Sequence, residues 1–363
     1  MRRTPLIPVA VAAVSLLATA FAPAADAADP EVVADALVSA LSVAVADDGT
    51  VYVSQNFAST ITQVAPGGEP EPIFADEGHR EVGGLSVAGD VLTFTTTSLD
   101  GPPSAHVHTL TPGNEGREET EIADTWAFEK AQNPDGRTTY GISRLSKSCR
   151  KDIPRRLRAV VLPYRGIKES HPYATTSIGD TTYVADAAAN AIFSVDGSET
   201  ISTVAVLPPV KVQVTKRFRK SMRLPKCTQG KVYKGEPVPT DVEVGPDGNL
   251  YVTTLGGGLG ESMPVGALYK ITTAGTVTKE AGRLMSPTGV GISNTGTAYV
   301  SMLFADTVLT APLVGEPSTF AEIPFPGDAE IEGHSVYVTR TGLTDPPEGP
   351  FTGAVLKYPA AVG

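Results

Sequence analysis

A short unit recurs six times along this chain of 363 residues, and no other feature constrains the fold as strongly. In each copy an apolar segment leads into a glycine or Asx turn and leaves it as a strand centred on an aromatic residue. The clearest copy runs from Pro239 to Val252 around Asp247-Gly248. Glycine and Asx residues adopt the positive φ of tight turns, and Val, Tyr and Thr favour half-buried strands, so each copy is predicted to be a β-hairpin. The other copies centre on Tyr52, Phe94, Tyr183, Tyr299 and Tyr337.

The spacing of these hairpins predicts an all-β protein with a β-propeller fold. A module of about 40 residues cannot bury its apolar face alone, and modules closed into a ring leave few open edges. The 36 glycines and 30 prolines fit many turns and few long helices. We favour six blades over seven, because residues 126–132 lack strand alternation and fit a short helix or loop better. One propeller domain is expected from residue 28 to 363.

The N-terminus has the pattern of a secretory signal peptide. Arg2 and Arg3 precede an apolar run from Leu6 to Ala22, and Ala25-Asp26-Ala27 then places small residues where signal peptidase reads them. Residues 1–27 are therefore predicted to be removed after Ala27, with Ala24 as the alternative. The competing interpretation is a membrane anchor, but the run is short for a span. The mature chain is expected to be secreted, monomeric and without a transmembrane segment.

Charge is segregated along the chain. The net charge is -11, yet residues 137–168 hold ten Lys and Arg against one acid, and residues 211–234 hold nine against none. These two segments carry +18, which leaves -29 for the rest of the chain. Each segment contains one of the two cysteines, Cys149 and Cys227. In an oxidising compartment these are predicted to form a disulfide rather than two free thiols or a metal site.

The two basic segments, at about 137–168 and 211–234, interrupt the repeat on either side of the Tyr183 hairpin and are predicted to be long loops that leave the ring together. A shared basic patch suits a polyanion such as a teichoic-acid-like envelope polymer, anionic lipid headgroups or nucleic acid, and another protein is a further candidate partner. Aromatic residues are too few for a single-strand stacking platform, and sequence-specific nucleic-acid binding is not expected. Two alternatives stay open: the loops neutralise the acidic ring within the molecule, or they are solvated without a role. The predicted patch comprises Arg150, Lys151, Arg155, Arg156, Arg158, Lys216, Arg217, Arg219, Lys220 and Arg223.

Three motifs, in this order, resemble the secreted ScyD/ScyE family. Phe128-Glu129 with Asn133-Pro134-Asp135-Gly136 is similar to its FE…NPDG segment, residues 184–190 to its VADA…N stretch, and residues 238–252 to its VPT…GPDG blade. The resemblance covers about residues 32–359. It implies a secreted propeller with NHL-like repeats and no established reaction. The two basic segments and residues 255–258 depart from the family pattern, which puts a shared ligand in doubt.

Propeller geometry places candidate binding residues at the mouth of the central channel. The alternatives are a binding or scaffold protein without turnover, and a calcium- or zinc-dependent hydrolase of the lactonase type. Oxygen ligands would suit Ca²⁺, although Asp and Asn are also common turn residues. The predicted channel-mouth residues are Asn56, His171, Asp186, Asn190 and Asp241, with Glu81 and Asp306 as further candidates.

Two other motifs carry weaker predictions. His106 and His108 alternate along a predicted strand and would point to one face as a metal pair, but no third ligand is evident. The glycine-rich residues 256–260 lack a following lysine and a helix signal, so a flexible loop is favoured over a phosphate cradle.

Overall fold

The computed structural model describes residues 29–113, 116–311, 317–343 and 352–360, so the predicted signal peptide lies outside the described residues. It contains seven antiparallel four-stranded sheets, which confirms the predicted all-β class. Among the described residues no helix is long and apolar enough to cross a membrane.

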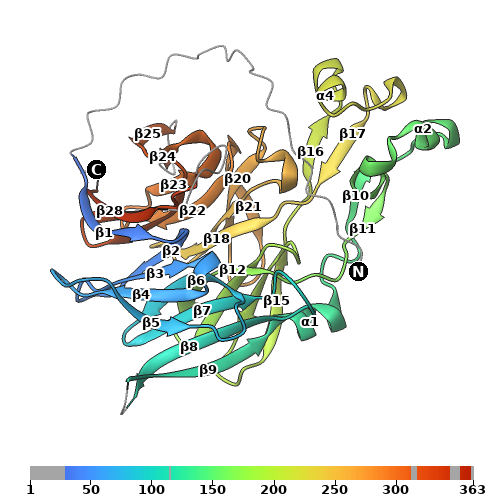
Figure 1. Cartoon of the computed structure of the whole chain (residues 1–363). Helices are drawn as coiled ribbons and strands as arrows, with labels where there is room; N and C mark the ends of the chain where they lie inside the picture. Colours follow the sequence, from blue (N-terminus) through green and yellow to red (C-terminus); the bar gives the residue numbers. More distant parts are fainter. Residues whose placement is uncertain (1–28, 114–115, 312–316, 344–351, 361–363) are drawn as a thin grey trace.

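Six of the sheets surround a common axis (Figure 1). Their first strands, β2, β6, β12, β18, β22 and β26, contact one another in a closed cycle, with β26 returning to β2. This cycle is the arrangement of a β-propeller and favours six blades. In chain order the ring strands are β2 (Ala40–Val45), β3 (Val51–Gln55), β4 (Thr60–Val64), β5 (Glu71–Ala75), β6 (Glu81–Ala88), β7 (Val91–Thr97), β8 (Ala105–Gly113), β9 (Gly116–Asp124), β12 (Pro172–Ile178), β13 (Thr181–Asp186), β14 (Ala191–Val195), β15 (Ile201–Val206), β18 (Pro239–Val244), β19 (Leu250–Thr254), β20 (Gly266–Ile271), β21 (Val277–Leu284), β22 (Pro287–Ile292), β23 (Ala298–Met302), β24 (Thr307–Ala311), β25 (Ser318–Glu322), β26 (Pro326–Glu332), β27 (Ser335–Arg340) and β28 (Gly353–Pro359).

The last sheet of the ring is built from both ends of the chain. Strand β1 (Glu31–Leu37) pairs with β28, so that Glu31 lies opposite Lys357. The sheet order is β1-β28-β27-β26, which closes the ring through backbone hydrogen bonds. The N-terminal strand therefore completes the last blade, and the chain continues from it into the first blade.

Apolar clusters between neighbouring sheets hold the ring together. In one of them Tyr183 and Ile192 of the third sheet pack with Val242 and Val252 of the fourth. Similar clusters join the first sheet to the second and the fifth to the sixth. The strand aromatics of the repeated unit contribute to these layers, and Tyr251 and Tyr299 are almost completely buried.

The seventh sheet stands apart from the ring (Figure 1). It combines both basic segments, in the order β11-β10-β17-β16, and Gly141 pairs with Lys234 across the two segments. We call residues 137–168 and 210–235 the basic module. Its elements are β10 (Thr139–Ile142), α2 (Lys147–Asp152), η2 (Arg155–Leu157), α3 (Arg158–Val161), β11 (Tyr164–Arg165), β16 (Val210–Gln213), α4 (Lys216–Ser221), η3 (Lys226–Thr228) and β17 (Val232–Gly235).

The predicted disulfide between Cys149 and Cys227 is confirmed, with Cα atoms 5.8 Å apart. It joins α2 of the first segment to η3 of the second. Beside it an apolar cluster includes Ile153, Val214 and Phe218, and Leu259 reaches it from η4 (Gly257–Leu259) of the ring. The predicted long loops are thus ordered short elements with their own small core.

Candidate functional site

Three predicted residues meet at one end of the inner strands. Glu81, at the start of β6, accepts a hydrogen bond of 3.0 Å from the Asn56 amide and lies 3.0 Å from His171 Nε2. Asn56 stands in the short helix η1 (Asn56–Ala58), and its amide oxygen accepts from the Ser39 hydroxyl. These groups satisfy one another, so the structure brings Asn56, Glu81 and His171 into one polar network.

Glu81 and His171 form an ion pair. Burial by itself would raise the pKa of Glu81, but the hydrogen bond and charge of His171 and the Asn56 amide hold it below its ordinary value. Burial by itself would lower the pKa of His171, but the hydrogen bond and charge of Glu81 raise it. Both shifts favour the charged pair, because each ion stabilises the other.

Asp186 extends this network along the chain. Its carboxylate accepts from the His171 backbone N–H at 2.8 Å, the Ser170 hydroxyl at 2.6 Å and the Ala189 N–H at 3.0 Å. It lies at the end of β13, where it holds the turn into β14 and the segment that enters β12. Its position makes it a support for His171.

Asn190 faces the joint between the ring and the basic module. It has a left-handed conformation, with φ of 55°, in the turn before β14. Its amide group donates to Asp135 Oδ2 at 3.0 Å, and its oxygen accepts from Val238 N–H at 3.1 Å. It therefore anchors the entry to β18 and lies apart from the Glu81 network.

Asp241 is part of a group of acids on the inner strands that the sequence prediction only partly found. Its carboxylate accepts from Val290 N–H at 2.5 Å and Val242 N–H at 2.8 Å, which ties β18 to β22. Asp328 on β26 likewise accepts from the Ser42 hydroxyl at 2.9 Å and from Val43 N–H at 3.0 Å on β2. These two aspartates therefore connect neighbouring blades.

Two more acids lie on these inner strands: Glu243 follows Asp241 by two residues on β18, and Glu330 follows Asp328 by two residues on β26. Burial and then the charge of Asp328 raise the pKa of Asp241, and the same two causes raise the pKa of Glu330 to about 8. Burial and then the charge of Glu330 raise the pKa of Glu243. The sequence pattern Pro-x-Asp-x-Glu, which occurs at residues 239–243 and 326–330, could have identified these four acids.

No support for a calcium site at the channel mouth comes from this geometry. Asn56, Glu81 and His171 bond to one another, and Asp186 accepts from two backbone N–H groups and a hydroxyl. Among the described residues no group of three or more His, Cys, Asp or Glu side chains is arranged to hold a metal ion.

Asp306, the remaining predicted candidate, caps the turn after η5 (Leu303–Ala305) and accepts from Phe325 N–H at 2.9 Å.

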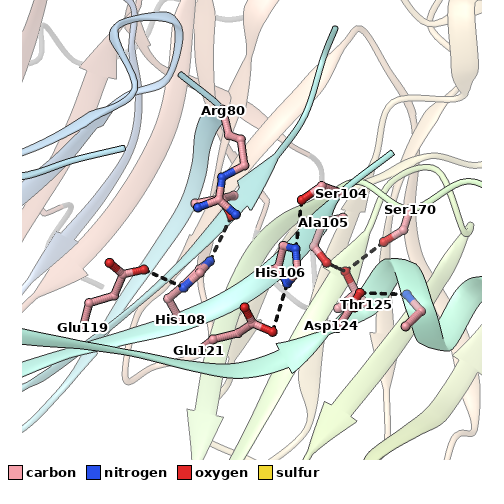
Figure 2. A network of polar contacts seen from close by, with 12 residues as sticks. Arg80, Ser104, Ala105, His106, His108, Glu119, Glu121, Asp124, Thr125 and Ser170 are labelled. Carbon is pink, nitrogen blue, oxygen red and sulfur yellow. Dashed lines mark hydrogen bonds and ion pairs between the residues drawn. The ribbon is translucent and has the colours of Figure 1, made fainter. Parts of the chain in front are cut away.

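His106 and His108 share one face of β8, with ring centroids 5.9 Å apart (Figure 2). Each ring faces an acid on β9: His108 Nδ1 lies 2.9 Å from Glu119 Oε1, and His106 Nδ1 lies 3.1 Å from Glu121 Oε1. His108 Nε2 contacts the Thr96 hydroxyl, and His106 Nε2 contacts the Ser104 hydroxyl. Burial lowers the pKa of His108 to about 4, so it is neutral near pH 7. All four ring nitrogens have neighbours, which favours a network within the blade over a metal pair.

The basic module keeps its charges away from the ring. Nine of the ten predicted patch residues are exposed, and Arg219 is half-buried. None of them forms an ion pair within the part of the chain that the structure describes. Arg150 and Arg158 instead donate to the carbonyls of Leu145 and Ile153 inside the module. The separate sheet and core of these segments favour loops that project from the ring over loops that fold back and neutralise it.

A shallow groove of 360 Å³ lies at the rim of the ring. It contains none of the predicted site residues. Its lining combines apolar and acidic side chains from β9, α1 (Thr125–Gln132), the turn before β15 and the first residue of β15: Glu121, Ile122, Ala123, Asp124, Phe128, Glu199 and Ile201.

No protein-family model matches the chain, and no curated protein matches its sequence. Solved structures resemble it at low identity. A luciferin-regenerating enzyme is 9% identical over 92% of this chain and 96% of its own, with a TM-score of 0.56. The PQQ-bound aldose sugar dehydrogenase of Streptomyces coelicolor is 12% identical over 91% and 96%, with a TM-score of 0.54. A putative gluconolactonase is 12% identical over 92% and 93%, also with a TM-score of 0.54.

These similarities support the β-propeller fold and extend over most of the described chain. At such identities they concern the fold alone, since one fold hosts many activities. The resemblance to the ScyD/ScyE family is not confirmed by them and stays a prediction.

Proposed function

We propose that this protein is a secreted binding propeller of the ScyD/ScyE type, in which the basic module holds a phosphate-bearing polymer of the cell envelope. The ring then serves as the scaffold that carries the module. The observation that carries this proposal is the module itself: nineteen Lys and Arg against one acid, projecting from the ring and free of ion pairs within the described residues.

The physical basis is electrostatic attraction between clustered cations and a repeating anion. A polymer with regularly spaced phosphates loses condensed counterions when Lys and Arg neutralise it, so binding weakens steeply with added salt. The disulfide and the small apolar cluster hold the two basic segments together before any partner arrives. Less conformational entropy is then lost on binding than with two separate flexible loops.

A location outside the cytoplasm fits this partner. Disulfides persist in oxidising compartments, and the Cys149–Cys227 bond is consistent with one. The N-terminal sequence has the charged, apolar and small-residue regions of a signal peptide. We keep the metal-dependent hydrolase as the alternative, although no observation at the channel mouth favours it.

Binding of the mature chain to a soluble poly(glycerol phosphate) tests the proposal. Fluorescence anisotropy would be measured over a series of salt concentrations. The logarithm of the binding constant should fall linearly with the logarithm of salt, with a slope of several units. Replacing Lys151, Arg155, Lys216 and Arg217 by Gln should lower that slope by about 3 and weaken binding at low salt at least tenfold.

A variant with the same loss of charge on the ring is the control. Lys270, Lys279, Arg283 and Lys357 replaced by Gln should leave the slope nearly unchanged. Equal effects of the two variants would show that net charge alone governs binding, which would contradict a module site. No binding at low salt would also contradict the proposal, and binding only to lipid vesicles or nucleic acid would reassign the partner.

A further inference from the structure

Four buried oxygen atoms at the joint between ring and basic module have no hydrogen-bond partner. They are both carboxylate oxygens of Glu129, Asn133 Oδ1 and Asp135 Oδ1. Glu129 and Asp135 are each 0% exposed. A buried ionised carboxylate without a donor or a counter-charge is costly, so such a cluster is expected to take up either protons or a cation.

The three residues are close along the chain, and the charge of Asp135 acts on Glu129. Glu129 lies in the last turn of α1, and Asn133 ends that helix in a left-handed conformation with φ of 42°. The Asn133 amide group donates to the Gly166 carbonyl at 3.2 Å. Asp135 Oδ1 approaches the same residue so closely that a Cβ on Gly166 would lie 1.7 Å from it. Asp135 and the Asn133 amide group therefore both pack against Gly166, where a side chain would not fit.

Positive charge is scarce around this cluster. The neighbouring acids Asp186 and Asp135 both act electrostatically on Glu129. The positive charge of Lys168 opposes the effect of these acids on Glu129. Its amino group, however, donates to the Lys130 carbonyl at the surface. Asp135 Oδ2 is already occupied by Tyr140 and Asn190, so only Oδ1 is free to face the cluster.

We propose that Glu129, Asn133 and Asp135 form a calcium site that fastens the basic module to the ring. Carboxylate and amide oxygens are the ligands that Ca²⁺ prefers, and it accepts irregular arrangements of six to eight of them. Mg²⁺ fits less well, because it retains several waters and demands an octahedral site, whereas these carboxylates are fully buried.

The position of the site suggests what calcium does. Asp135 holds Tyr140 of β10 in the module and Asn190 of the ring through the same oxygen, with contacts of 2.9 and 3.0 Å. A cation bound to its other oxygen fixes this connection. Loss of calcium should therefore loosen the module relative to the ring and leave the disulfide intact.

Calcium titration of the chelator-treated mature chain tests this site. Isothermal titration calorimetry should show one saturable Ca²⁺ site per chain, and the melting temperature should rise with the logarithm of calcium concentration. Terbium provides an independent readout, because Tyr140 lies beside Asp135 and can sensitise bound Tb³⁺. That emission should be displaced by Ca²⁺.

Two variants separate coordination from folding. Glu129→Gln keeps the side-chain shape, and it should weaken calcium binding more than about tenfold while unfolding no earlier than wild type in chelator, because a buried charge is gone. Exposed Glu118→Gln is the matched control and should bind calcium as wild type does. Equal melting temperatures of wild type with calcium and with chelator, together with no calorimetric site, would overturn the proposal and show Glu129 to be a protonated, dry acid. None of these readouts depends on polymer binding.

Discussion

The ring and the basic module differ in what stabilises them and in where they place their charges. The ring closes on itself through its inner strands and through β1 and β28, and it encloses acids such as Asp241 and Asp328 among backbone donors. The module has a small apolar cluster, a two-residue strand and a disulfide, and it leaves its cations in solvent. Buried charges in the ring thus connect blades, while exposed charges on the module are available to a partner.

Removing the disulfide should have the largest effect on this contrast. Cys149→Ser with Cys227→Ser should destabilise the module by about 4 kcal/mol, since the loop between them no longer restricts the unfolded chain. The ring should keep its structure. Limited trypsin digestion with mass spectrometry would show early cuts within residues 137–168 and 210–235. Simultaneous cutting throughout the ring would contradict the view that the two regions are stabilised separately.

The buried acids of the ring should make its stability depend on pH. The pKa of Glu330 is raised to about 8 in the fold from 4.5, so between those values the folded state binds more protons than the unfolded state. Stability should therefore fall as pH rises through this window, by up to about 5 kcal/mol for Glu330. Melting temperatures at several pH values should fall less steeply for Glu330→Gln than for wild type. A slope identical to that of wild type would show that Glu330 is already ionised in the fold.

Exposed charges should change stability least. Lys270 lies 3.8 Å from Asp247 and 3.9 Å from Glu280 on the ring surface, and Lys270→Gln should cost less than about 1 kcal/mol. Neutralising Arg155 and Arg217 on the module should instead stabilise it by a few tenths of a kcal/mol at low salt, because like charges repel. Chemical denaturation at low and high salt would measure both. A destabilised module would mean that these arginines make favourable contacts within it.

Local turn chemistry made the ring predictable from the sequence. Each hairpin depends on neighbouring residues, such as Asp247 and Gly248 before the strand of Tyr251, and the structure has these strands where the pattern indicates them. The sheet of the basic module was not predictable in this way. Its strand β10 pairs with β17, and Gly141 and Lys234 are separated along the chain by the whole third blade.

The candidate site was predictable only as a set of residue types. Asn56, Glu81 and His171 stood out as polar residues at expected loop positions, but their mutual saturation depends on contacts between blades. Glu243 and Glu330 were missed because polar residues that alternate along a strand ordinarily face solvent. In a ring of blades the same strand face packs against the neighbouring blade, as the contacts of Asp241 and Asp328 show. Glu129 was noted only within a motif, since its burial depends on the module that covers it.

The pairing of β1 with β28 determines when folding can be completed. Glu31 and Lys357 are near opposite ends of the chain, so the last blade cannot form until almost the whole polypeptide is available. Contacts of such long sequence separation form slowly. A chain that lost β28 would expose the edge of β27, and exposed edges pair with other chains. Damage confined to the final residues would therefore produce an aggregating ring, even though most blades remained intact.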